Sequence, residues 1–510
     1  MKPTPFLGVD ELERDPYLRA MKAVAASGEA GPLYLVGGYL RDLLHGRGRT
    51  RRADLDVVIW GEPERFGRGL IGILQGSLVR LDPETVRAII RSAGVIVQID
   101  ISRPKGETIE DDLAARDFTI NALAARIDTP APQPPIPNPL SVIDPVGGLN
   151  DLREKRLRAL APSAFDRDPL RLIRAVRLAA ELGFTIEEAS RQWIIERASL
   201  LGTVAGERLR DELFRILEMV PAAPWIEQLD DLRLLKALVP EVEALKSVPA
   251  STPHRLPLWE HSLESLRSIE LLLTNLERLL PDEAVWLRER LGLEIEAGVT
   301  ETAILKLLGF LHDIGKPETR SLQPNGRVRF LGHEQAGLPI LARLCERLRL
   351  GRLATSLVAG IEQHHVRPIH LSSATAVTAR AQYRFCREAG DAAPLVLLHS
   401  WADLRATIGD EAEEFSRHQR FLRDTFRFYN TEFLTSQAEP LIRGDDVIDR
   451  FGIAPSPFLG FVLDRLQEAQ ATRLINSREE ALAYVQEHLE SWRQSFDAPP
   501  ASRQPRVESH

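Results

Sequence analysis

The stretch from residue 35 to residue 60 reads LVGGYLRDLLHGRGRTRRADLDVVIW and sets the fold of the N-terminal part of the chain. An apolar strand stops at Gly37 and Gly38, a short helical segment follows, and a second apolar strand carries Asp54 and Asp56. Side chains two residues apart in a strand point to the same face. Carboxylates held that close repel each other unless a cation lies between them. The stretch therefore predicts a metal site on a strand beside a glycine turn.

The glycine turn has two readings. Backbone N–H groups between a strand and a helix can approach a phosphate, and the helix N-terminus favours negative charge. A tight turn explains Gly-Gly equally well. Arg41, further along the helical segment, either contacts a phosphate while Asp42 holds it or forms a surface ion pair with Asp42.

Asp100 supplies a third carboxylate within the apolar run VIVQIDIS. Three converging strand carboxylates suit Mg²⁺, which takes oxygen ligands and keeps part of its shell for substrate phosphates. The alternative is that these carboxylates cap strand ends or pair with arginines. We expect a magnesium site.

The composition is that of ordinary soluble globular material, and 510 residues exceed one core, so several domains are expected. The two cysteines, Cys345 and Cys386, suit a reducing compartment and predict neither a disulfide-linked partner nor a thiolate zinc site. No apolar run approaches the roughly 20 residues of a membrane span, and the N-terminus lacks the apolar core of a signal peptide. We expect a cytoplasmic protein without a membrane partner. No oligomeric state is predicted.

The net charge of −8 argues against a wholly basic nucleic-acid binder but allows a local basic patch, such as the run at 47–52.

Short β-branched runs up to about residue 150 predict strands, while PERFGRGLIGILQG (63–76) and PETVRAIIRSAG (83–94) are expected to be helical. Later segments show helical spacing of apolar residues. The fold class is therefore α+β. The expected regions are an α/β head (1–150), a helical neck (151–247), a helical domain (248–430), a C-terminal helical region (431–496) and a disordered tail (497–510), with an exposed Pro-rich loop at 128–140.

Six short blocks follow one another between Gly37 and Leu217. They are GGYLRD (37–42), DLD (54–56), ARDFTINALA (115–124), VIDPVGGLNDL (142–152), DPLRLIRAVRLAAELGFTI (168–186) and GERLRDELFRIL (206–217). Together they resemble the motifs of the class II tRNA nucleotidyltransferase and bacterial poly(A) polymerase family, within the polymerase-beta nucleotidyltransferase superfamily. The resemblance implies a polymerase-beta-type head that transfers CMP or AMP from CTP or ATP to a tRNA 3′ end without a nucleic-acid template.

The resemblance also assigns site residues. Asp54, Asp56 and Asp100 are implied as the catalytic carboxylates that hold Mg²⁺. The implied nucleotide contacts are Gly37, Gly38 and Arg41 for the triphosphate, Asp117 and Asn121 for the ribose and backbone, and Asp168 and Arg171 for the base.

The pair assigned to the base makes chemical sense. Asp168 and Arg171 are spaced i, i+3 and are expected on one helix face. A carboxylate accepts from an exocyclic amine and a guanidinium donates to ring and carbonyl acceptors, a pattern that C and A share and that G and U do not. The structural alternative is a helix N-cap, because Asp168 precedes Pro169 at an expected first helical position.

Three departures from the family pattern bear on the product. Arg167 stands where the family usually has Glu, and Ala115 stands where it often has Arg. Between Arg103 and Glu110 only PKGETI intervenes, where full CCA-adding members carry a longer flexible loop. That loop resembles the element needed to switch from C to A, so its brevity favours CC-only addition, with CCA addition still open. A poly(A) polymerase is the nearest alternative, weakly disfavoured because the C-terminal tail is not basic.

A second constellation lies in the helical body. Its histidines and carboxylates follow the order of the HD phosphohydrolase superfamily, and HDIGK resembles the signature of that superfamily. The segments are LWEHSLESL, FLHDIGKPE, LGHEQAG, IEQHHVRP and SWADLRA. A single helical histidine is more often packed or exposed than a ligand, but the ordered set predicts a site for Mn, Fe, Ni, Zn or Mg. The site is either catalytically active or an idle scaffold. The alternative to a nucleotidyltransferase is an HD phosphohydrolase whose head only binds nucleotide. The expected ligands are His261, His312, Asp313, His333, His364 (with His365 beside it) and Asp403.

Overall fold

The computed structural model describes most of the chain, namely residues 15–26, 28, 31–46, 52–92, 95–128 and 142–497. The chain divides into two compact units, residues 1–219 with 228–238 and residues 220–227 with 239–510. The side chains of the basic run at 47–52, most of the Pro-rich loop and the tail beyond Asp497 lie outside the described residues. The finer division into five regions stays a prediction.

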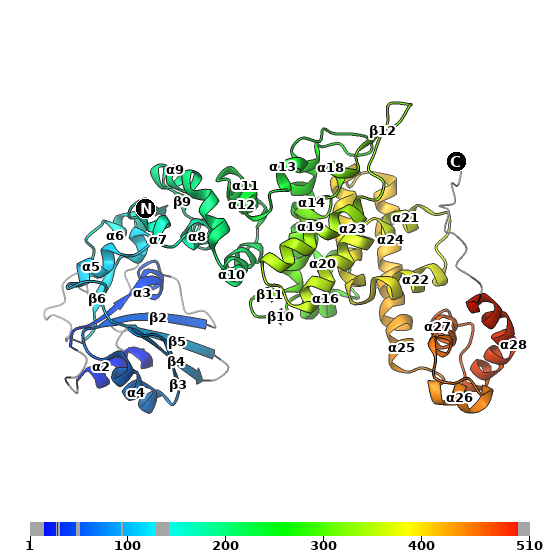
Figure 1. The fold of residues 1–510 in the computed structure, drawn as a ribbon, viewed down its shortest axis with the longest axis horizontal. Helices are drawn as coiled ribbons and strands as arrows, with labels where there is room; N and C mark the ends of the chain where they lie inside the picture. Colours follow the sequence, from blue (N-terminus) through cyan, green and yellow to red (C-terminus); the bar gives the residue numbers. More distant parts are fainter. Residues whose placement is uncertain are drawn as a thin grey trace. The chain divides into compact units, whose positions relative to one another are not determined.

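A seven-stranded mixed sheet forms the head of the first unit (Figure 1). Its order is β3-β4-β5-β2-β1-β6-β7, with β2 and β5 parallel and the other neighbours antiparallel. The central strands are apolar and buried, as at Leu55 and Ile99. The strands are β1 (Leu33–Val36), β2 (Arg52–Ile59), β3 (Ser77–Asp82), β4 (Thr85–Ser92), β5 (Val95–Ser102), β6 (Ala124–Arg126) and β7 (Val142–Ile143).

Helices cover this sheet and continue into a helical neck. α3 packs on β1, β2 and β6, whereas α4 packs on β3, β4 and β5. In the view of Figure 1, α3 lies above the strands and α2 with α4 below them. A short parallel pair joins β8 (Arg156–Leu157) to β9 (Thr185–Ile186). The helices are α2 (Pro16–Ala25), α3 (Gly37–Leu44), α4 (Pro63–Leu74), α5 (Ile109–Ala114), α6 (Gly148–Arg153), α7 (Ser163–Arg167), α8 (Leu170–Leu182), α9 (Glu188–Arg197), α10 (Gly206–Leu217), α11 (Ala223–Asp231) and α12 (Leu234–Leu238).

One expected helix of the head is wrong. Within the segment 83–94, residues Thr85–Ser92 form strand β4, hydrogen-bonded to β3 and β5. Its apolar side chains alternate, and Val86, Ala88 and Ile90 are buried on one face. This alternation is the period of a half-buried strand, which outweighs the helical spacing of the same residues. The expected helix at 63–76 is confirmed by α4.

The second unit is almost entirely helical. Its centre is formed by α14, α17 and α23, which pack against one another. Near the C-terminus α26, α27 and α28 bury a separate small core that includes Val447, Val462 and Val485. The helices are α13 (Val242–Leu245), α14 (Leu258–Thr274), α15 (Leu276–Leu279), α16 (Ala284–Leu291), α17 (Glu301–Leu311), α18 (Lys316–Thr319), α19 (His333–Arg347), α20 (Arg352–His364), α21 (Arg367–Ser373), α22 (Ala379–Ala389), α23 (Ala393–Ile408), α24 (Glu413–Phe428), α25 (Leu434–Ala438), α26 (Gly444–Phe451), α27 (Pro457–Ala471) and α28 (Arg478–Asp497).

Two short hairpins interrupt the helices of this unit. The first joins β10 (Glu294–Glu296) to β11 (Val299–Thr300), and the second joins β12 (Ser321–Leu322) to β13 (Val328–Arg329). The expected α+β class, with a mixed-sheet head before a helical body, is confirmed. Across the described ranges, no helix has both the length and the apolar character needed to cross a membrane.

Candidate functional site

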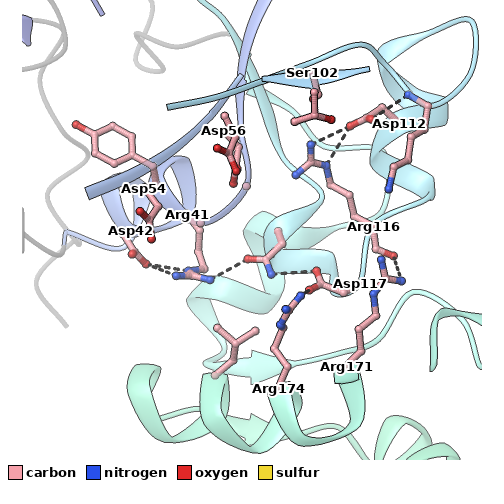
Figure 2. A pocket seen from close by; sticks show the side chains of 18 of the residues that line it. Arg41, Asp42, Asp54, Asp56, Ser102, Asp112, Arg116, Asp117, Arg171 and Arg174 are labelled. Carbon is pink, nitrogen blue, oxygen red and sulfur yellow. Dashed lines mark hydrogen bonds and ion pairs between the residues drawn. The ribbon is translucent and has the colours of Figure 1, made fainter. Parts of the chain in front are cut away.

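A cavity of about 1130 Å³ opens in the first unit beside the central strands of the sheet (Figure 2). Asp54 and Asp56 on β2 and Asp100 on β5 all line it, as the sequence predicts. Asp56 and Asp100 are direct neighbours across the parallel β2–β5 pair. Of the nucleotide contacts expected from the sequence, all but Asp168 line the same cavity.

The Gly-Gly turn is shaped around Asp56. Gly37 has a φ of +72°, a backbone conformation that side chains disfavour. A Cβ at Gly37 would lie 2.5 Å from Asp56 Oδ2, so any larger residue would displace the carboxylate. The N-terminus of α3 thus begins directly beside Asp56, and its first N–H groups and the carboxylate share one corner of the cavity.

Asp56 is the carboxylate whose ionisation the cavity changes most clearly. Burial raises the pKa of Asp56 to about 6, Asp100 and Asp54 add to the rise, and the Arg116 guanidinium opposes it. A carboxylate whose burial disfavours ionisation is stabilised as an anion when a cation binds next to it. The environment of Asp56 therefore fits a metal ligand.

Asp100 has a partner of its own. Arg87 on the neighbouring strand β4 donates from Nε to Oδ1 at 2.6 Å and from Nη2 to Oδ2 at 2.8 Å. The two residues face each other across the β4–β5 ladder. The alternative in which a strand carboxylate pairs with an arginine therefore holds for Asp100, and its charge is partly neutralised.

A continuous chain of polar contacts crosses the floor of the cavity (Figure 2). Arg41 donates to Asp42 Oδ1 at 2.8 Å and to Asn121 Oδ1 at 2.9 Å. Asn121 in turn donates to Asp117 Oδ1 at 3.0 Å, and Arg174 lies 3.7 Å from Asp117 Oδ2. The chain links the glycine-turn helix, the segment 117–121 and α8, so three of the sequence blocks build one wall.

The two residues expected to read a base differ in their surroundings. Arg171, in the first turn of α8, lines the cavity, and its Nε is buried without a hydrogen-bond partner among the described residues. Asp168 precedes the helix, pairs with Arg208 at 3.0 Å and does not line the cavity. Its Oδ1 accepts from the Leu170 N–H at 3.4 Å, so it caps α8 only weakly.

Several lining residues were not predicted from the sequence, among them Arg116, Asp112 and Arg174. Arg116 and Asp112 are paired at 2.9 Å, and Arg174 follows Arg171 by three residues on the same helix face. The spacing of Arg171 and Arg174 was the available signal. Nothing in the sequence indicated that Asp112 would lie beside the segment 103–109.

The second unit holds a cluster of buried histidines and carboxylates. His261 comes from α14, His312 and Asp313 follow α17, and Asp403 lies on α23. Two groups have ligand atoms within 4.8 Å of one another: His261, His312 and Asp403, and Asp313, His333 and His365. Among the described residues these two are the groups of His, Cys, Asp and Glu side chains close enough to hold a metal ion. The structure thus brings together five of the six ligands expected in the body.

His365, rather than the expected His364, joins the cluster. His365 is buried, whereas the His364 side chain is only half-buried and lies outside both groups. Val358 and Ile361 are buried on α20, and His365 continues their helical face. That spacing was the signal in the sequence that separates the two histidines.

Hydrogen bonds fix which ring nitrogens face the centre of the cluster. His333 Nδ1 lies 2.9 Å from the Phe330 carbonyl oxygen and His365 Nδ1 lies 2.7 Å from that of Glu362, so both Nδ1 atoms are donors. The Nε2 atoms then carry lone pairs and lie only 3.2 Å apart. Two lone pairs at that separation repel each other unless a cation binds between them.

Asp313 bridges the two groups. Its Oδ2 lies 3.2 Å from His312 Nε2 and its Oδ1 lies 3.5 Å from His333 Nε2. Burial disfavours charge on His312, but Asp313 and Asp403 outweigh it and raise the pKa of His312 to about 10. Lys316 Nζ lies 2.6 Å from Asp313 Oδ2, whereas Asp313 Oδ1 is buried without a hydrogen-bond donor among the described residues. Positive charge would therefore stabilise the buried carboxylates and facing ring nitrogens of the cluster, and these nitrogen and oxygen donors fit a divalent transition metal.

Three family models match successive parts of the chain. The family model described as "Poly A polymerase head domain" matches residues 33–158. A second, described as "Probable RNA and SrmB- binding site of polymerase A", matches residues 183–246. A third, described as "HD domain", matches residues 258–398. The three matches follow one another in the expected order, and the third contains the histidines of the cluster and Asp313 but ends before Asp403.

Relatives match along nearly the whole chain. The A-adding tRNA nucleotidyltransferase of Deinococcus radiodurans is 31% identical over 464 residues, 89% of this chain and 95% of the relative. The CC-adding tRNA nucleotidyltransferase of Geobacter sulfurreducens is 31% identical over 459 residues, 89% and 91% of the two chains. A solved CCA-adding enzyme, apo form I, shares the fold with a TM-score of 0.63, at 21% identity and with coverage of 95% and 96%. The chain therefore belongs to the tRNA nucleotidyltransferase family.

Proposed function

We propose that this enzyme transfers CMP, AMP or both from CTP and ATP to the 3′ end of tRNA. The polar chain from Asp42 through Arg41, Asn121 and Asp117 to Arg174 carries the proposal, because it joins the segments that would contact triphosphate, ribose and base. Family membership supports the same reaction. The predicted compartment is the cytoplasm, where tRNA is processed.

In the head we assign Asp54 and Asp56 to Mg²⁺. When bound there, Mg²⁺ favours attack of the RNA 3′-hydroxyl on the α-phosphate and neutralises the departing pyrophosphate. Gly37 and Gly38 bring the N-terminus of α3 to the triphosphate, and Arg41 adds a guanidinium held in place by Asp42 and Asn121. Asp100, oriented by Arg87, completes the negative surface as a third carboxylate.

Base recognition is assigned to Arg171 and Asp168. The unpartnered Nε of Arg171 is a buried donor that a base acceptor would satisfy. Asp168 must exchange its contact with Arg208 for an exocyclic amine before it can take part. Asp117 and Asn121, already hydrogen-bonded to each other, lie where a ribose hydroxyl would be contacted.

The finer proposal is that only C is added. The segment after Arg103 is short, and carboxylates hold its backbone: Lys105 N–H donates to Asp112 at 3.1 Å and Thr108 N–H donates to Asp111 at 3.0 Å. Gly106 lies at a φ of +114°, closely packed on Asp111. A segment fixed at this many points is poorly suited to reshape the cavity from a C site to an A site.

Three tRNA transcripts test this proposal. They end at the discriminator base, at C and at CC, and each is given labelled CTP or labelled ATP. We expect two C residues on the first, one on the second and no A on the third. Incorporation of A onto the CC-ending transcript would refute CC-only addition, and long A-tails on unrelated RNA would indicate a poly(A) polymerase.

Two substitutions test the head chemistry itself. Removing a metal ligand costs several kcal/mol of transition-state stabilisation, so Asp56→Ala should lower C incorporation about a thousandfold or more. Asp211→Ala, at an exposed carboxylate of α10, serves as the matched control and should retain activity. Full incorporation by Asp56→Ala would show that the assigned metal site is not the catalytic one.

The histidine cluster favours a second activity. We propose a metal-dependent phosphohydrolase activity on phosphate esters at RNA 3′ ends. The metal would be held by His261, His312, Asp313, His333, His365 and Asp403. A divalent metal such as Mn, Ni, Fe, Zn or Mg supplies a Lewis acid and an activated water when bound there. Lys316 Nζ, 2.6 Å from Asp313 and 3.0 Å from His254 Nε2, adds a cation at the edge of the cluster for a phosphate.

The test compares wild type with Asp313→Ala on an RNA bearing a 2′,3′-cyclic phosphate, with each metal in turn. We expect hydrolysis that depends on the metal and on Asp313, while C incorporation by the head is unchanged. Equal hydrolysis by both proteins would exclude the cluster as the hydrolase. Absence of hydrolysis with every metal would identify the cluster as a scaffold.

A further inference from the structure

The hairpin β12–β13 carries an unusual concentration of positive charge. Residues 320–331, RSLQPNGRVRFL, contain Arg320, Arg327 and Arg329 and no acidic residue, in a chain whose net charge is −8. All three arginines are exposed. Figure 1 shows β12 in a hairpin that extends beyond the neighbouring helices of its unit.

None of the three arginines forms an ion pair with a carboxylate of the described residues. Elsewhere in the same unit arginines are commonly neutralised, as Arg290 is by Glu301 at 2.7 Å and Arg405 by Glu264 at 3.1 Å. Guanidinium groups left without carboxylates are available to an external anion, and their planar donor geometry matches phosphate.

One end of the hairpin contacts the histidine cluster, and the other end follows the helix that carries Lys316. At one end, Phe330 accepts a hydrogen bond from His333 Nδ1 through its carbonyl oxygen at 2.9 Å. The Phe330 ring lies 5.6 Å from Lys316 Nζ, which contacts Asp313 at 2.6 Å. At the other end, Arg320 directly follows the short helix α18 that begins at Lys316. The basic hairpin thus ends at a residue that contacts the cluster and begins directly after the short helix whose first residue, Lys316, contacts Asp313.

We propose that the β12–β13 hairpin is the RNA-docking element of the histidine cluster. Its arginines bind phosphates of the RNA backbone, and its anchored base directs the 3′-terminal phosphate toward Lys316 and the cluster. Leu322 and Leu331, 73% and 72% exposed, offer apolar surface on which an unpaired base can rest. The proposal rests on the phosphohydrolase activity proposed above, because the RNA end that the hairpin docks is the substrate of that activity.

RNA fits this surface better than an acidic protein. The hairpin spans only 12 residues, fewer than the roughly 20–30 residues a side of a specific protein–protein interface, whereas a few exposed guanidinium groups are enough to contact phosphates. Its neighbouring site is suited to phosphate esters, and an RNA end would satisfy both at once. An acidic protein partner would leave RNA binding independent of the three arginines.

Two full-length variants separate docking from chemistry. In the first, Arg320, Arg327 and Arg329 are all replaced by Gln, and in the matched control Arg278, Arg417 and Arg420, exposed on α15 and α24, are replaced by Gln. On a short single-stranded RNA with a 2′,3′-cyclic phosphate, the hairpin variant should raise KM about tenfold or more with kcat nearly unchanged. Hydrolysis of p-nitrophenyl phosphate, which has no RNA backbone, should not change. The control variant should match wild type on both substrates.

A cross-linking experiment gives a readout that does not depend on hydrolysis. Asn325→Cys at the hairpin turn, labelled with a photo-reactive maleimide, should cross-link to the same RNA, and labelled Ser416→Cys on α24 should not. Cross-linking should weaken as salt rises, because phosphate contacts release counterions. Absence of a specific cross-link from position 325, or an unchanged KM for RNA in the hairpin variant, would overturn the proposal. Specific cross-linking without any hydrolysis would support docking and refute the phosphohydrolase activity.

Discussion

Arg87 holds both carboxylate oxygens of Asp100, at 2.6 and 2.8 Å, on the strand next to the one that carries Asp54 and Asp56. The pair places a second positive charge, besides the Arg116 guanidinium, near the three carboxylates of this corner. We therefore expect the strength of cation binding at Asp56 to depend on a residue that does not contact the cation.

Substitution of Arg87 and substitution of Asp100 should change the Mg²⁺ requirement of the enzyme in opposite directions. Arg87→Ala removes a positive charge and should lower the Mg²⁺ concentration for half-maximal C incorporation about three- to tenfold, as roughly 1 kcal/mol of Coulomb energy implies. Asp100→Asn should raise it. Mg²⁺ titrations of initial rates measure both, with Arg87→Lys as the charge-preserving control. A shift in the same direction for both variants would mean that the pair acts only through geometry.

Nucleotide addition should become more sensitive to acid when Mg²⁺ is scarce. The pKa of Asp56 is raised to about 6 by burial and by its neighbouring carboxylates, so below about pH 6 a proton occupies the oxygen that the cation needs. At subsaturating Mg²⁺ the rate should fall toward tenfold per pH unit below that value. Higher Mg²⁺ should move the midpoint to lower pH, because cation and proton compete. A midpoint that does not respond to Mg²⁺ would exclude Asp56 as the titrating ligand.

Arg171→Ala should reduce the efficiency of C incorporation about 10- to 100-fold, the range of a good hydrogen-bonded base contact. The change removes the buried donor Nε that has no partner among the described residues. The preference for CTP over UTP, measured as the ratio of kcat/KM values, should fall as well. Arg167→Ala is the control, since Arg167 is exposed at the end of α7 and should change neither quantity. Unchanged selectivity in Arg171→Ala would move base reading to another residue.

Neighbouring histidines should differ in metal binding. His365→Ala should lower the bound transition metal, measured by elemental analysis after dialysis, because the His365 Nε2 faces His333 Nε2 at 3.2 Å. His364→Ala should retain the metal, since His364 lies outside the cluster. Equal loss from both variants would show a general disturbance of α20, and retention by His365→Ala would remove His365 from the ligand set.

Acid should destabilise the second unit through His418. Burial lowers the pKa of His418 to about 4, whereas an unfolded histidine titrates near 6.5. The unfolded chain therefore takes up a proton first as the pH falls, and stability is lost between about pH 6.5 and pH 4, by about 3 kcal/mol at the limit. Calorimetry at pH 7.5 and pH 5 should show a smaller drop of Tm in His418→Gln than in wild type.

The His418→Gln protein should nevertheless melt earlier than wild type at pH 7.5. It loses the contacts of Nδ1 with Ser372 at 2.8 Å and of Nε2 with Ser400 at 3.1 Å. Equal pH sensitivity in the two proteins would show that other groups dominate the acid response.

The sequence by itself determined the class of the fold and the main chemistry of the head. Asp54 and Asp56 alternate within an apolar strand, and Gly37 and Gly38 end another, so period and turn chemistry are local properties that residue order carries. The helices of the body follow from apolar spacing for the same reason.

Tertiary structure decided what depends on contacts between distant segments. Residues Thr85–Ser92 became strand β4 because β3 and β5 pair with it on both sides, and Asp100 acquired Arg87 only through that pairing. His365 was selected over His364 because helix packing turns one of two adjacent side chains inward. Asp112 came to hold the segment after Arg103 because chain folding brought its carboxylate to the Lys105 N–H. Such pairings depend on separations in space, which residue order does not specify until the sheet and the helices have packed.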